Sequence, residues 1–210
     1  MELGTLASIW RYPVKSLRGE RLARAEVDHG GIPGDRSSAL FVSRGHAREG
    51  KPYRGKEHDR LHLTADPEAA RRLGAEPGVD LEYRAGKHFF DAAPISILID
   101  RWMAPLNAHV GYSVEPERFR PNFFVRATAE FDSEEAALSG ATLYIGQAKL
   151  RVRQPIERCV AITYDPRGGA NDPEILRFLA QRCNGWMGIY CDVVIAGTVQ
   201  TGEPLVLSAA

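Results

Sequence analysis

Alternating apolar and polar residues dominate both ends of the chain and predict strands there. Short alternating stretches that end at glycine, proline or aspartate turns are typical of half-buried β-strands. The stretches with this pattern are residues 3–10, 21–27, 38–42, 61–64, 79–83, 143–145, 150–152, 190–195 and 204–207. With one more short strand near residue 160, the sequence predicts roughly ten strands.

Helical spacing is confined to three stretches. Residues 66–73 and 172–182 each begin with an aspartate cap followed by proline at the first helical position. The third, from Pro94 to about His109, has a helical stripe of apolar residues, and Pro105 predicts a kink or a break within it. Strands outnumber helices, so we expect a mainly β protein with flanking helices, an α+β fold centred on a β-barrel.

Two connections between these elements contain unusual residues. Residues 29–36 form a dense turn with three glycines, and Lys15 projects from an earlier loop interrupted by a proline. Residues 44–60 are polar and rich in cations, without regular periodicity. A loop of this length is either a solvated excursion or a lid over a site, and the sequence leaves both interpretations open.

The composition is that of an ordinary globular protein. The chain has 210 residues, 44% hydrophobic and 26% charged, with a formal net charge of +0. This balance gives no indication of nucleic-acid or acidic-membrane binding. The start lacks the features of a signal peptide, no apolar run reaches membrane-spanning length, and three cysteines form no disulfide framework. We therefore expect a reduced, cytoplasmic protein.

Cys159 is the residue with the most distinctive chemical surroundings. It follows Arg158 at the predicted end of a strand, just before the turn that begins at Asp165. A neighbouring arginine favours the thiolate, which is both a nucleophile and a ligand for soft metals. A cysteine in a strand can equally be a small buried apolar residue. For Cys183 and Cys191 we expect packing rather than reactivity.

Arg118 and Arg120 lie two residues apart in a segment that we interpret as extended. In such a segment both side chains point to the same face, where two guanidiniums repel each other unless an anion lies between them. The alternative is pairing with Glu115, Glu117 or other carboxylates. The sequence does not decide between anion binding and structural pairing.

Common nucleotide, metal and hydrolase motifs are missing from the sequence. It contains no phosphate-binding glycine loop, no dinucleotide fingerprint, no H-E-x-x-H and no G-x-S-x-G. His58 and His62 are four residues apart, which gives only weak support for a zinc site.

Several motifs in order resemble one known family. They are Tyr12-Pro13-Val14-Lys15-Ser16, Gly34-Asp35-Arg36, Phe90-Asp91-x-x-Pro94, Arg118-Phe119-Arg120-Pro121-Asn122, Arg158-Cys159 with Asp165-Pro166, and Gly197-x-x-x-x-Gly202. Together they resemble MOSC-domain proteins, a family that includes molybdenum-cofactor sulfurase C-terminal domains and amidoxime-reducing components. The resemblance implies an N-terminal β-rich domain over residues 1–88 and a MOSC domain over residues 89–210.

The resemblance also implies a molybdenum cofactor held between the two parts. Cys159 would ligate molybdenum and act in catalysis, with Asp165 as a candidate proton-relay or positioning residue. The resemblance implies five cofactor-binding residues: Lys15, Ser16, Arg36, Arg120 and Asn122. The neighbouring arginines Arg118 and Arg158 are further cofactor-binding candidates. The implied activity is reduction of N-hydroxylated small molecules with electrons from a separate ferredoxin- or flavin-type reductase.

Two departures from the family leave alternatives open. Where the reductase branch has two serines, the matching residues here are Ile99 and Trp102, which predicts apolar bulk near the cofactor pocket. The cationic stretch from Arg48 to Arg60 replaces the family's usual segment after the third strand. Two alternative functions therefore remain: a sulfur carrier or cofactor-handling protein with a persulfide on Cys159, and a degenerate anion-binding module.

Overall fold

Strands from the two ends of the chain close on each other to form a β-barrel. The computed structural model describes residues 1–45, 48–75, 79–86 and 88–208. The strands in this part of the chain are β1 (Glu2–Arg11), β2 (Glu20–Leu22), β3 (Arg24–Val27), β4 (Ser38–Arg44), β5 (Asp80–Ala85), β6 (Ile95–Ile99), β7 (Phe123–Ala127), β8 (Thr142–Ile145), β9 (Ala148–Glu157), β10 (Trp186–Ile195), β11 (Gly197–Gln200) and β12 (Pro204–Leu207).

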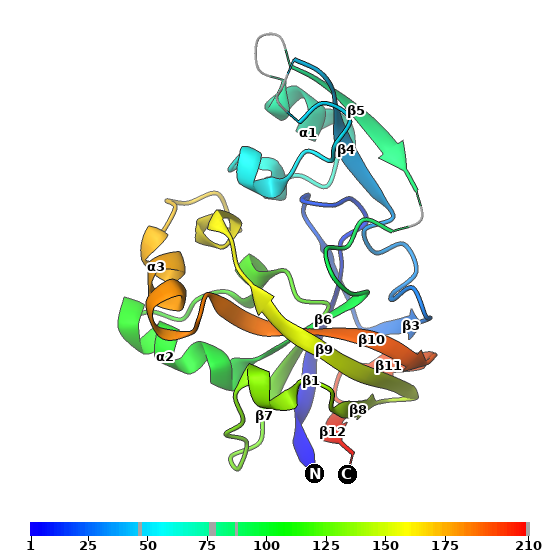
Figure 1. The fold of residues 1–210 in the computed structure, drawn as a ribbon, viewed down its shortest axis with the longest axis vertical. Helices are drawn as coiled ribbons and strands as arrows, with labels where there is room; N and C mark the ends of the chain where they lie inside the picture. The colour runs from blue at the N-terminus through cyan, green and yellow to red at the C-terminus, as the bar shows by residue number, and fades with distance from the viewer. Residues whose placement is uncertain (46–47, 76–78, 87, 209–210) are drawn as a thin grey trace.

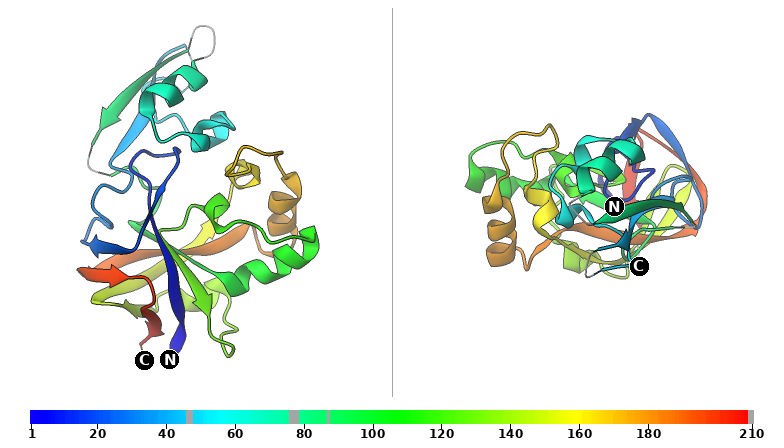
Figure 2. Two further views of the ribbon diagram at one scale, coloured as in Figure 1. Left: turned by 180° about the vertical axis from the view of Figure 1, so that it is seen from behind. Right: turned by 90° about the horizontal axis from the view of Figure 1, so that it is seen from above.

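The barrel runs in the order β12-β8-β9-β10-β6-β7-β1, and β1 closes it by pairing again with β12. β2 extends the sheet beside β1, and β6 and β7 form its parallel pair. The two termini lie side by side, where the Met1 amino group donates to the Leu207 carbonyl over 2.9 Å (Figures 1 and 2). The prediction of a mainly β fold centred on a barrel is confirmed.

Two helices lie side by side against one flank of the barrel (Figure 1). They are α2 (Asp100–Val110) and α3 (Pro173–Arg182), while α1 (Pro67–Gly74) lies away from the barrel. α1 and α3 begin as the sequence predicts, because Asp66 and Asp172 each accept a hydrogen bond from a backbone N–H of the first turn. None of the helices in the described residues is long and apolar enough to cross a membrane.

A second, smaller unit stands above the barrel, and we call it the upper lobe (Figure 1). It consists of the antiparallel pair β4–β5, α1 and two 3₁₀-helices, η1 (Gly55–Glu57) and η2 (Leu61–Leu63). Its core is a separate cluster that includes Leu40, Leu61 and Leu81. Val14 and Leu17, from the loop that follows β1, belong to the same cluster and tie the lobe to the barrel.

The predicted helix from Pro94 to His109 is wrong in its first half. Residues 95–99 form β6, whose five side chains are all buried between β10 and β7, and the helix begins only at Asp100. A strand that is buried on both faces is continuously apolar, so its pattern matches a buried helix as well as a strand. α2 continues through Pro105 as one helix.

Three of the predicted strands also differ in the structure. The predicted short strand near residue 160 is a 3₁₀-helix, η5 (Val160–Thr163). The predicted strand 61–64 is the 3₁₀-helix η2, and the predicted strand 21–27 is divided into β2 and β3. The division arises because β2 pairs with β1 whereas β3 pairs with β11 in a separate sheet. The predicted long loop 44–60 contains only η1 as a helical segment in its described part, and residues 46 and 47 lie outside the described residues.

The predicted domain boundary after residue 88 stays a prediction. β1, from the first part of the chain, is a barrel strand.

Candidate functional site

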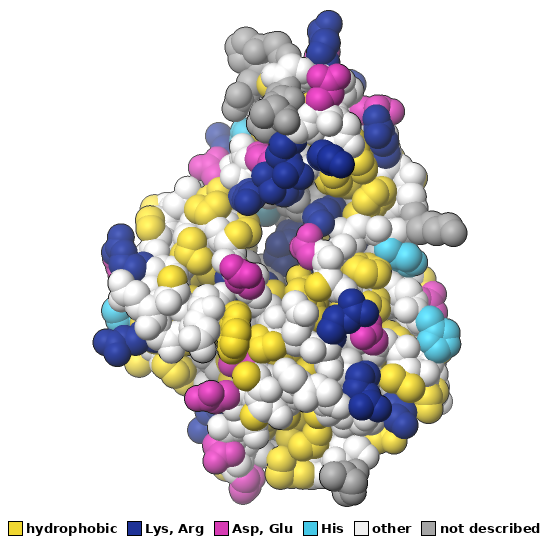
Figure 3. Space-filling model, in the orientation of Figure 1, with side chains coloured by type: hydrophobic (Ala, Val, Ile, Leu, Met, Phe, Trp, Pro, Cys, Tyr) yellow, Lys and Arg dark blue, Asp and Glu magenta, His cyan; other side chains and the backbone are white. Residues whose placement is uncertain are grey.

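A cavity of ≈ 300 Å³ lies between the barrel and the upper lobe. Figure 3 shows Lys and Arg side chains gathered around a hollow at this junction. All but one of the predicted site residues line this cavity: Lys15, Ser16, Arg36, Arg118, Arg120, Asn122, Arg158 and Cys159. The exception is Asp165. The tertiary structure therefore brings together residues that are up to about 140 positions apart in the sequence.

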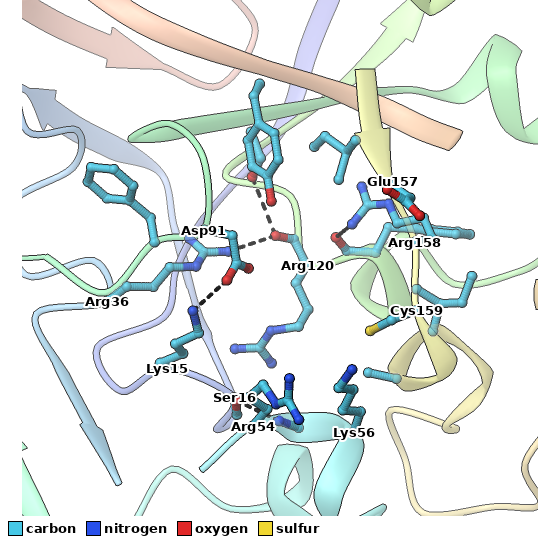
Figure 4. A pocket seen from close by; sticks show the side chains of 18 of the residues that line it. Lys15, Ser16, Arg36, Arg54, Lys56, Asp91, Arg120, Glu157, Arg158 and Cys159 are labelled. Atoms are coloured by element: carbon cyan, nitrogen blue, oxygen red, sulfur yellow. Dashed lines mark hydrogen bonds and ion pairs between the residues drawn. The ribbon is translucent and has the colours of Figure 1, made fainter. Parts of the chain in front are cut away.

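Cys159 presents an exposed thiol to the cavity (Figure 4). It follows the end of β9 and caps the short 3₁₀-helix η5 (Val160–Thr163), which agrees with the predicted position at a strand end. Cys183 is half-buried and Cys191 is fully buried in the barrel core. Burial raises the pKa of both of these thiols, so they pack as predicted.

Arg158 is fixed by backbone carbonyls beside Cys159. Its Nε and Nη2 donate to Met187 O at 2.8 and 2.5 Å, and its Nη1 donates to Phe119 O at 2.8 Å. Burial disfavours the charged guanidinium and lowers the pKa of Arg158 to about 10. The side chain has no carboxylate partner among the described residues, so its charge is held in place without being neutralised.

Arg118 and Arg120 do not share one face, so this prediction is wrong. Arg118 lies in the 3₁₀-helix η3 (Pro116–Phe119), and Arg120 follows it in the left-handed region with φ of 50°. Arg118 bonds Glu115 at 3.0 Å and lies 3.4 Å from Asp165, so it has the structural pairing that the sequence left open. The segment is therefore a 3₁₀-helix followed by a left-handed residue, not the extended strand that would place both side chains on one face.

Arg120, in contrast, has no acidic partner among the described residues. Its guanidinium lies over the ring of Tyr12 at 4.3 Å, and its Nη2 atom is buried without a hydrogen-bond partner. Burial lowers the pKa of Arg120 to about 10. A buried cation with an unused donor is the arrangement expected of an anion-binding residue.

Arg36 and Asn122 build the rigid floor of the cavity. Arg36 bonds Asp35 at 2.5 Å and the Arg120 carbonyl at 3.1 Å. Burial lowers the pKa of Arg36, but the Asp35 carboxylate together with Tyr12 and Tyr190 outweighs it, and the net effect is a raised pKa. Asn122 Oδ1 accepts from the backbone and hydroxyl of Ser96 at 3.1 and 2.9 Å.

Lys15 and Ser16 reach the cavity from the loop between β1 and β2. Lys15 Nζ lies 2.5 Å from Asp91, and Ser16 Oγ accepts the backbone N–H of Gly55 at 2.8 Å. The second contact joins the barrel loop to η1 of the upper lobe. Lys15 and Asp91 belong to two motifs that are far apart in the sequence, and the ion pair explains why both line one cavity.

Unfavourable backbone geometry is concentrated at this cavity. In the described residues, four non-glycine positions have positive φ: Ser16, Arg36, Arg120 and Asn184. The first three line the cavity. Such conformations cost about 1–3 kcal/mol each and are typical of sites where the backbone must present groups to a ligand.

The upper lobe contributes cations that sequence reasoning did not name individually. Arg54, just before η1, and Lys56, within it, point into the same space as Cys159 (Figure 4). Arg54 pairs with Glu57, whereas Lys56 has no ion pair or side-chain hydrogen bond among the described residues. The cationic composition of residues 44–60 and the lid interpretation were the available indications of their role.

Asp165 lies behind Arg118, outside the lining of the main cavity. Its carboxylate accepts the backbone N–H of Arg167 at 2.7 Å, and this bond is the main reason why its pKa is lowered. The predicted relay role of Asp165 stays a prediction, and this position gives the side chain no direct contact with the cavity.

Ile99 and Trp102 are absent from the cavity wall, so the expected apolar bulk in the pocket is wrong. Ile99 is fully buried in β6, and Trp102 packs on Phe131 and donates to the Ser133 carbonyl. The hydroxyl that lines the cavity from this region is Ser96, which the sequence analysis missed. Its position was obscured because β6 was interpreted as the start of a helix.

Histidine and carboxylate side chains give no metal cluster. Among the described residues, no group of three or more His, Cys, Asp or Glu side chains is arranged to hold a metal ion. His62 instead donates a 2.7 Å hydrogen bond from Nε2 to the Asp165 carbonyl. A metal at this cavity would therefore need most of its ligands from a bound organic cofactor.

Two sequence-family models match the chain. They are the MOSC domain over residues 85–206 and the MOSC N-terminal beta barrel domain over residues 3–72.

Curated relatives and a solved structure extend the comparison. Mitochondrial amidoxime reducing component 2 of Bos taurus is 26% identical over 142 residues, which cover 61% of this chain and 40% of that protein. The protein of the same name from Macaca fascicularis is 25% identical over 142 residues, covering 61% of this chain and 41% of its own. The match thus spans about two fifths of these relatives. The YUAD protein from Bacillus subtilis shares the fold, with a TM-score of 0.60 and 19% identity over 99% of this chain and 97% of its own.

Proposed function

This chain belongs to the MOSC domain family, and on that premise we propose that it binds a molybdenum cofactor in the cavity between barrel and upper lobe. We further propose that it is an oxidoreductase that reduces N-hydroxylated small molecules. The observation that carries the proposal is the position of the exposed Cys159 thiol opposite the unneutralised cations Arg120 and Lys56 in one cavity.

The residues at the cavity fit such a cofactor. A pyranopterin dithiolene is an anion with a phosphate group, and phosphate oxygens favour arginine and lysine donors. Arg120 has a buried unused donor, and Lys56 has no partner among the described residues. A soft thiolate suits a molybdenum centre, and Cys159 is the cysteine that lines the cavity.

Each group of residues would have a separate task in this function. Cys159 would be the protein ligand of the metal, while Arg120 and Lys56 would bind the anionic parts of the cofactor. Arg36, held by Asp35 and the Arg120 carbonyl, would keep the Arg120 backbone in its left-handed conformation. When bound, the cofactor would supply two-electron redox chemistry and a site for oxygen-atom transfer.

Electrons would come from a separate ferredoxin- or flavin-type reductase. Cys183 and Cys191 are half-buried and buried, so they do not offer an exposed cysteine set for an iron–sulfur cluster in this chain. The amidoxime reducing components that the chain resembles are longer proteins, of which it matches about two fifths.

A sulfur-carrier function is the second candidate, because the Cys159 thiol is exposed. A carrier needs a sulfur that exchanges with partners, and exposure makes that exchange accessible. The third candidate, a degenerate anion-binding module, loses its main support because Ile99 and Trp102 do not line the cavity.

Metal and pterin analysis would test the proposal directly. The full chain would be purified from a host that makes molybdenum cofactor, alongside Cys159→Ser and the control Cys183→Ser. We expect near-equimolar molybdenum and pterin in the wild type and in Cys183→Ser, and loss of molybdenum in Cys159→Ser. Protein without metal or pterin, but with a persulfide on Cys159, would instead favour the carrier.

A further inference from the structure

Two smaller cavities adjoin the main one and share Arg120 with it. The inner cavity, of ≈ 30 Å³, shares Gly55, Arg118, Arg120 and Ala161 with the main cavity. The outer cavity, of ≈ 200 Å³, shares His62, Glu117, Arg120 and Pro166 with the inner one. Arg120 lines all three cavities and so stands between the main cavity and the outer one. The outer cavity is also lined by Trp10, Arg18 and Arg167.

The inner cavity is suited to an ordered water. Its volume of ≈ 30 Å³ is enough for one molecule, and a buried water needs two to four polar partners. Arg120 lines this cavity, and its Nη2 atom is buried without a partner among the described residues. Nη2 carries two N–H donors, which would allow one bond to a ligand in the main cavity and one to water behind it.

His62 is the first titratable group on this path. Its Nε2 lies 2.7 Å from the Asp165 carbonyl, which only accepts, so Nε2 carries the hydrogen and the neutral ring keeps Nδ1 free of a proton. Burial lowers the pKa of His62, and Arg120 and Arg118 act in the same direction. The Asp165 carbonyl and Asp59 oppose that shift, and the Tyr164 ring stacks on the imidazole at 5.9 Å.

Glu117 is the second titratable group on the path. It lines both smaller cavities but not the main one. No ion pair or hydrogen bond is formed by its carboxylate within the described residues, whereas the neighbouring Glu115 is committed to Arg118 at 3.0 Å. Glu117 is therefore the acid on this path that is not held by an arginine.

We propose that the two cavities behind Arg120 form a back channel that delivers protons to the main cavity and releases water from it, with Glu117 and His62 as proton carriers. The inference rests on the proposed function. Reduction of an N-hydroxylated amine follows R–NH–OH + 2 e⁻ + 2 H⁺ → R–NH₂ + H₂O, with the electrons supplied by the separate reductase. The N–O bond breaks, and its oxygen leaves as water.

A separate route has a physical advantage in this arrangement. With cofactor and substrate in a cavity of ≈ 300 Å³, little space remains for water on the open side. A path that passes behind Arg120 would allow protons to enter and water to leave while both stay bound. General acid–base groups of this kind contribute about 10²–10⁴-fold to rate.

The first test uses isosteric variants that cannot carry a proton. In loaded enzyme, Glu117→Gln and His62→Gln are expected to lower kcat by about tenfold or more, with KM and molybdenum content unchanged, because neither residue lines the main cavity. Small diffusible acids such as imidazole should restore part of the lost rate. The matched control is Glu130→Gln, an exposed acid outside all three cavities, which should behave as wild type.

Unchanged kcat in both variants of an active, loaded enzyme would overturn the back channel and leave the proposed function intact. A second measurement separates the two proposals when no activity is found. The His62 imidazole would be followed by NMR in the full chain as purified, from pH 5 to pH 8. Reversible protonation, at a pKa below the ordinary value, supports proton access to His62; an imidazole that never titrates overturns the channel, whatever the protein contains.

Discussion

The barrel and the upper lobe hold opposite sides of the same cavity in different ways. The barrel side places its cations with backbone carbonyls, as Arg158 does with Met187 and Phe119. The lobe side offers Arg54, which pairs locally with Glu57, and Lys56, which has no side-chain partner among the described residues. One wall is fixed by a closed sheet, and the other rests on a two-stranded sheet with its own small core.

This difference indicates how a site between two units divides its tasks. The barrel presents the thiol and the positive-φ backbone in one geometry, which favours catalytic positioning. The lobe presents the cations Arg54 and Lys56 over the same space, which favours capture of an anionic ligand. Regions with small cores open at lower free energy than closed barrels, so the two walls should respond differently to the same kind of change.

The largest expected effect comes from paired core truncations. Ile97→Ala, at the centre of the fully buried β6, should lower the free energy of global unfolding by about 4 kcal/mol. Leu61→Ala, in the lobe core, should cost about 2–3 kcal/mol and open mainly the lobe. Urea unfolding and native-state hydrogen exchange would measure both.

The comparison would break if Leu61→Ala raised hydrogen exchange in β6 and β10 as much as in β4 and β5. In that case the two units would unfold as one, and the lobe would have no opening of its own.

The second effect concerns charge on the two walls. Arg158→Ala should lower the free energy of unfolding by about 2–3 kcal/mol, because it leaves the Met187 and Phe119 carbonyls without their donor. Arg54→Ala, the matched change on the lobe, should stay within about 1 kcal/mol since its ion pair is partly exposed. Equal losses in thermal unfolding would show that both walls are equally rigid.

A third prediction concerns how stability depends on pH. The dependence should have opposite signs for one glutamate of the barrel unit and one of the upper lobe. Burial raises the pKa of Glu135, in the 3₁₀-helix η4 (Glu135–Leu138) against β10, whereas hydrogen bonding to Arg84 lowers the pKa of the exposed Glu82 on β5. Stability from Glu135 is fully present below its unfolded pKa of about 4.3 and is lost as pH rises through the raised folded pKa. Glu135→Gln should therefore increase stability at pH 7 by less than about 1 kcal/mol.

For Glu82 the sign is reversed. Its contribution is present above the unfolded pKa and is lost as pH falls through the lowered folded pKa, so Glu82→Gln should lower stability slightly at pH 7. Unfolding curves of both variants at several pH values would check this, and shifts of the same sign would contradict it.

The smallest stability effect, with a clear binding effect, is expected at Lys56. Lys56→Ala should change the free energy of unfolding by less than about 0.5 kcal/mol. It should nevertheless weaken binding of inorganic pyrophosphate by about tenfold, or ~1.4 kcal/mol, because an unneutralised cation is removed from the cavity. Calorimetric titration would compare it with Lys51→Ala, an exposed cation outside the cavity lining. Equal losses would indicate a general surface-charge effect.

The main fold was predictable from the sequence. Of the site residues that the sequence indicated, all except Asp165 line the cavity. Most of the alternating stretches correspond to strands of the barrel or of the upper lobe, because one face of each strand is buried and the pattern records that face. The aspartate-proline starts of α1 and α3 are local signals and were correctly placed. Cys159 was placed at a strand end because the turn that follows is also local.

The incorrect predictions share one physical cause. β6 is buried at every position and apolar at every position except Ser96, because neighbours cover both of its faces. Only its pairing with β10 and β7 therefore distinguishes it from a helix. The faces of Arg118 and Arg120 depend on a left-handed turn, and Ser96 was missed because its strand was misread. Lys56 follows Gly55, whose backbone N–H donates to Ser16 and joins the lobe to the barrel loop, and the sequence does not show this contact.

The sequence by itself therefore determined a barrel-centred β protein and its capped helices. It also supplied a set of cationic residues and one thiol, suited to binding an anion and a soft metal. Only the tertiary structure decided that Arg118 is paired while Arg120 keeps an unused donor. It also decided that Ile99 and Trp102 lie outside the cavity lining, and that Arg120 lines three adjoining cavities. The physical reason is that hydrophobic periodicity and turn chemistry act between near neighbours in the chain, whereas a cavity and its charge balance arise from contacts between residues far apart in it.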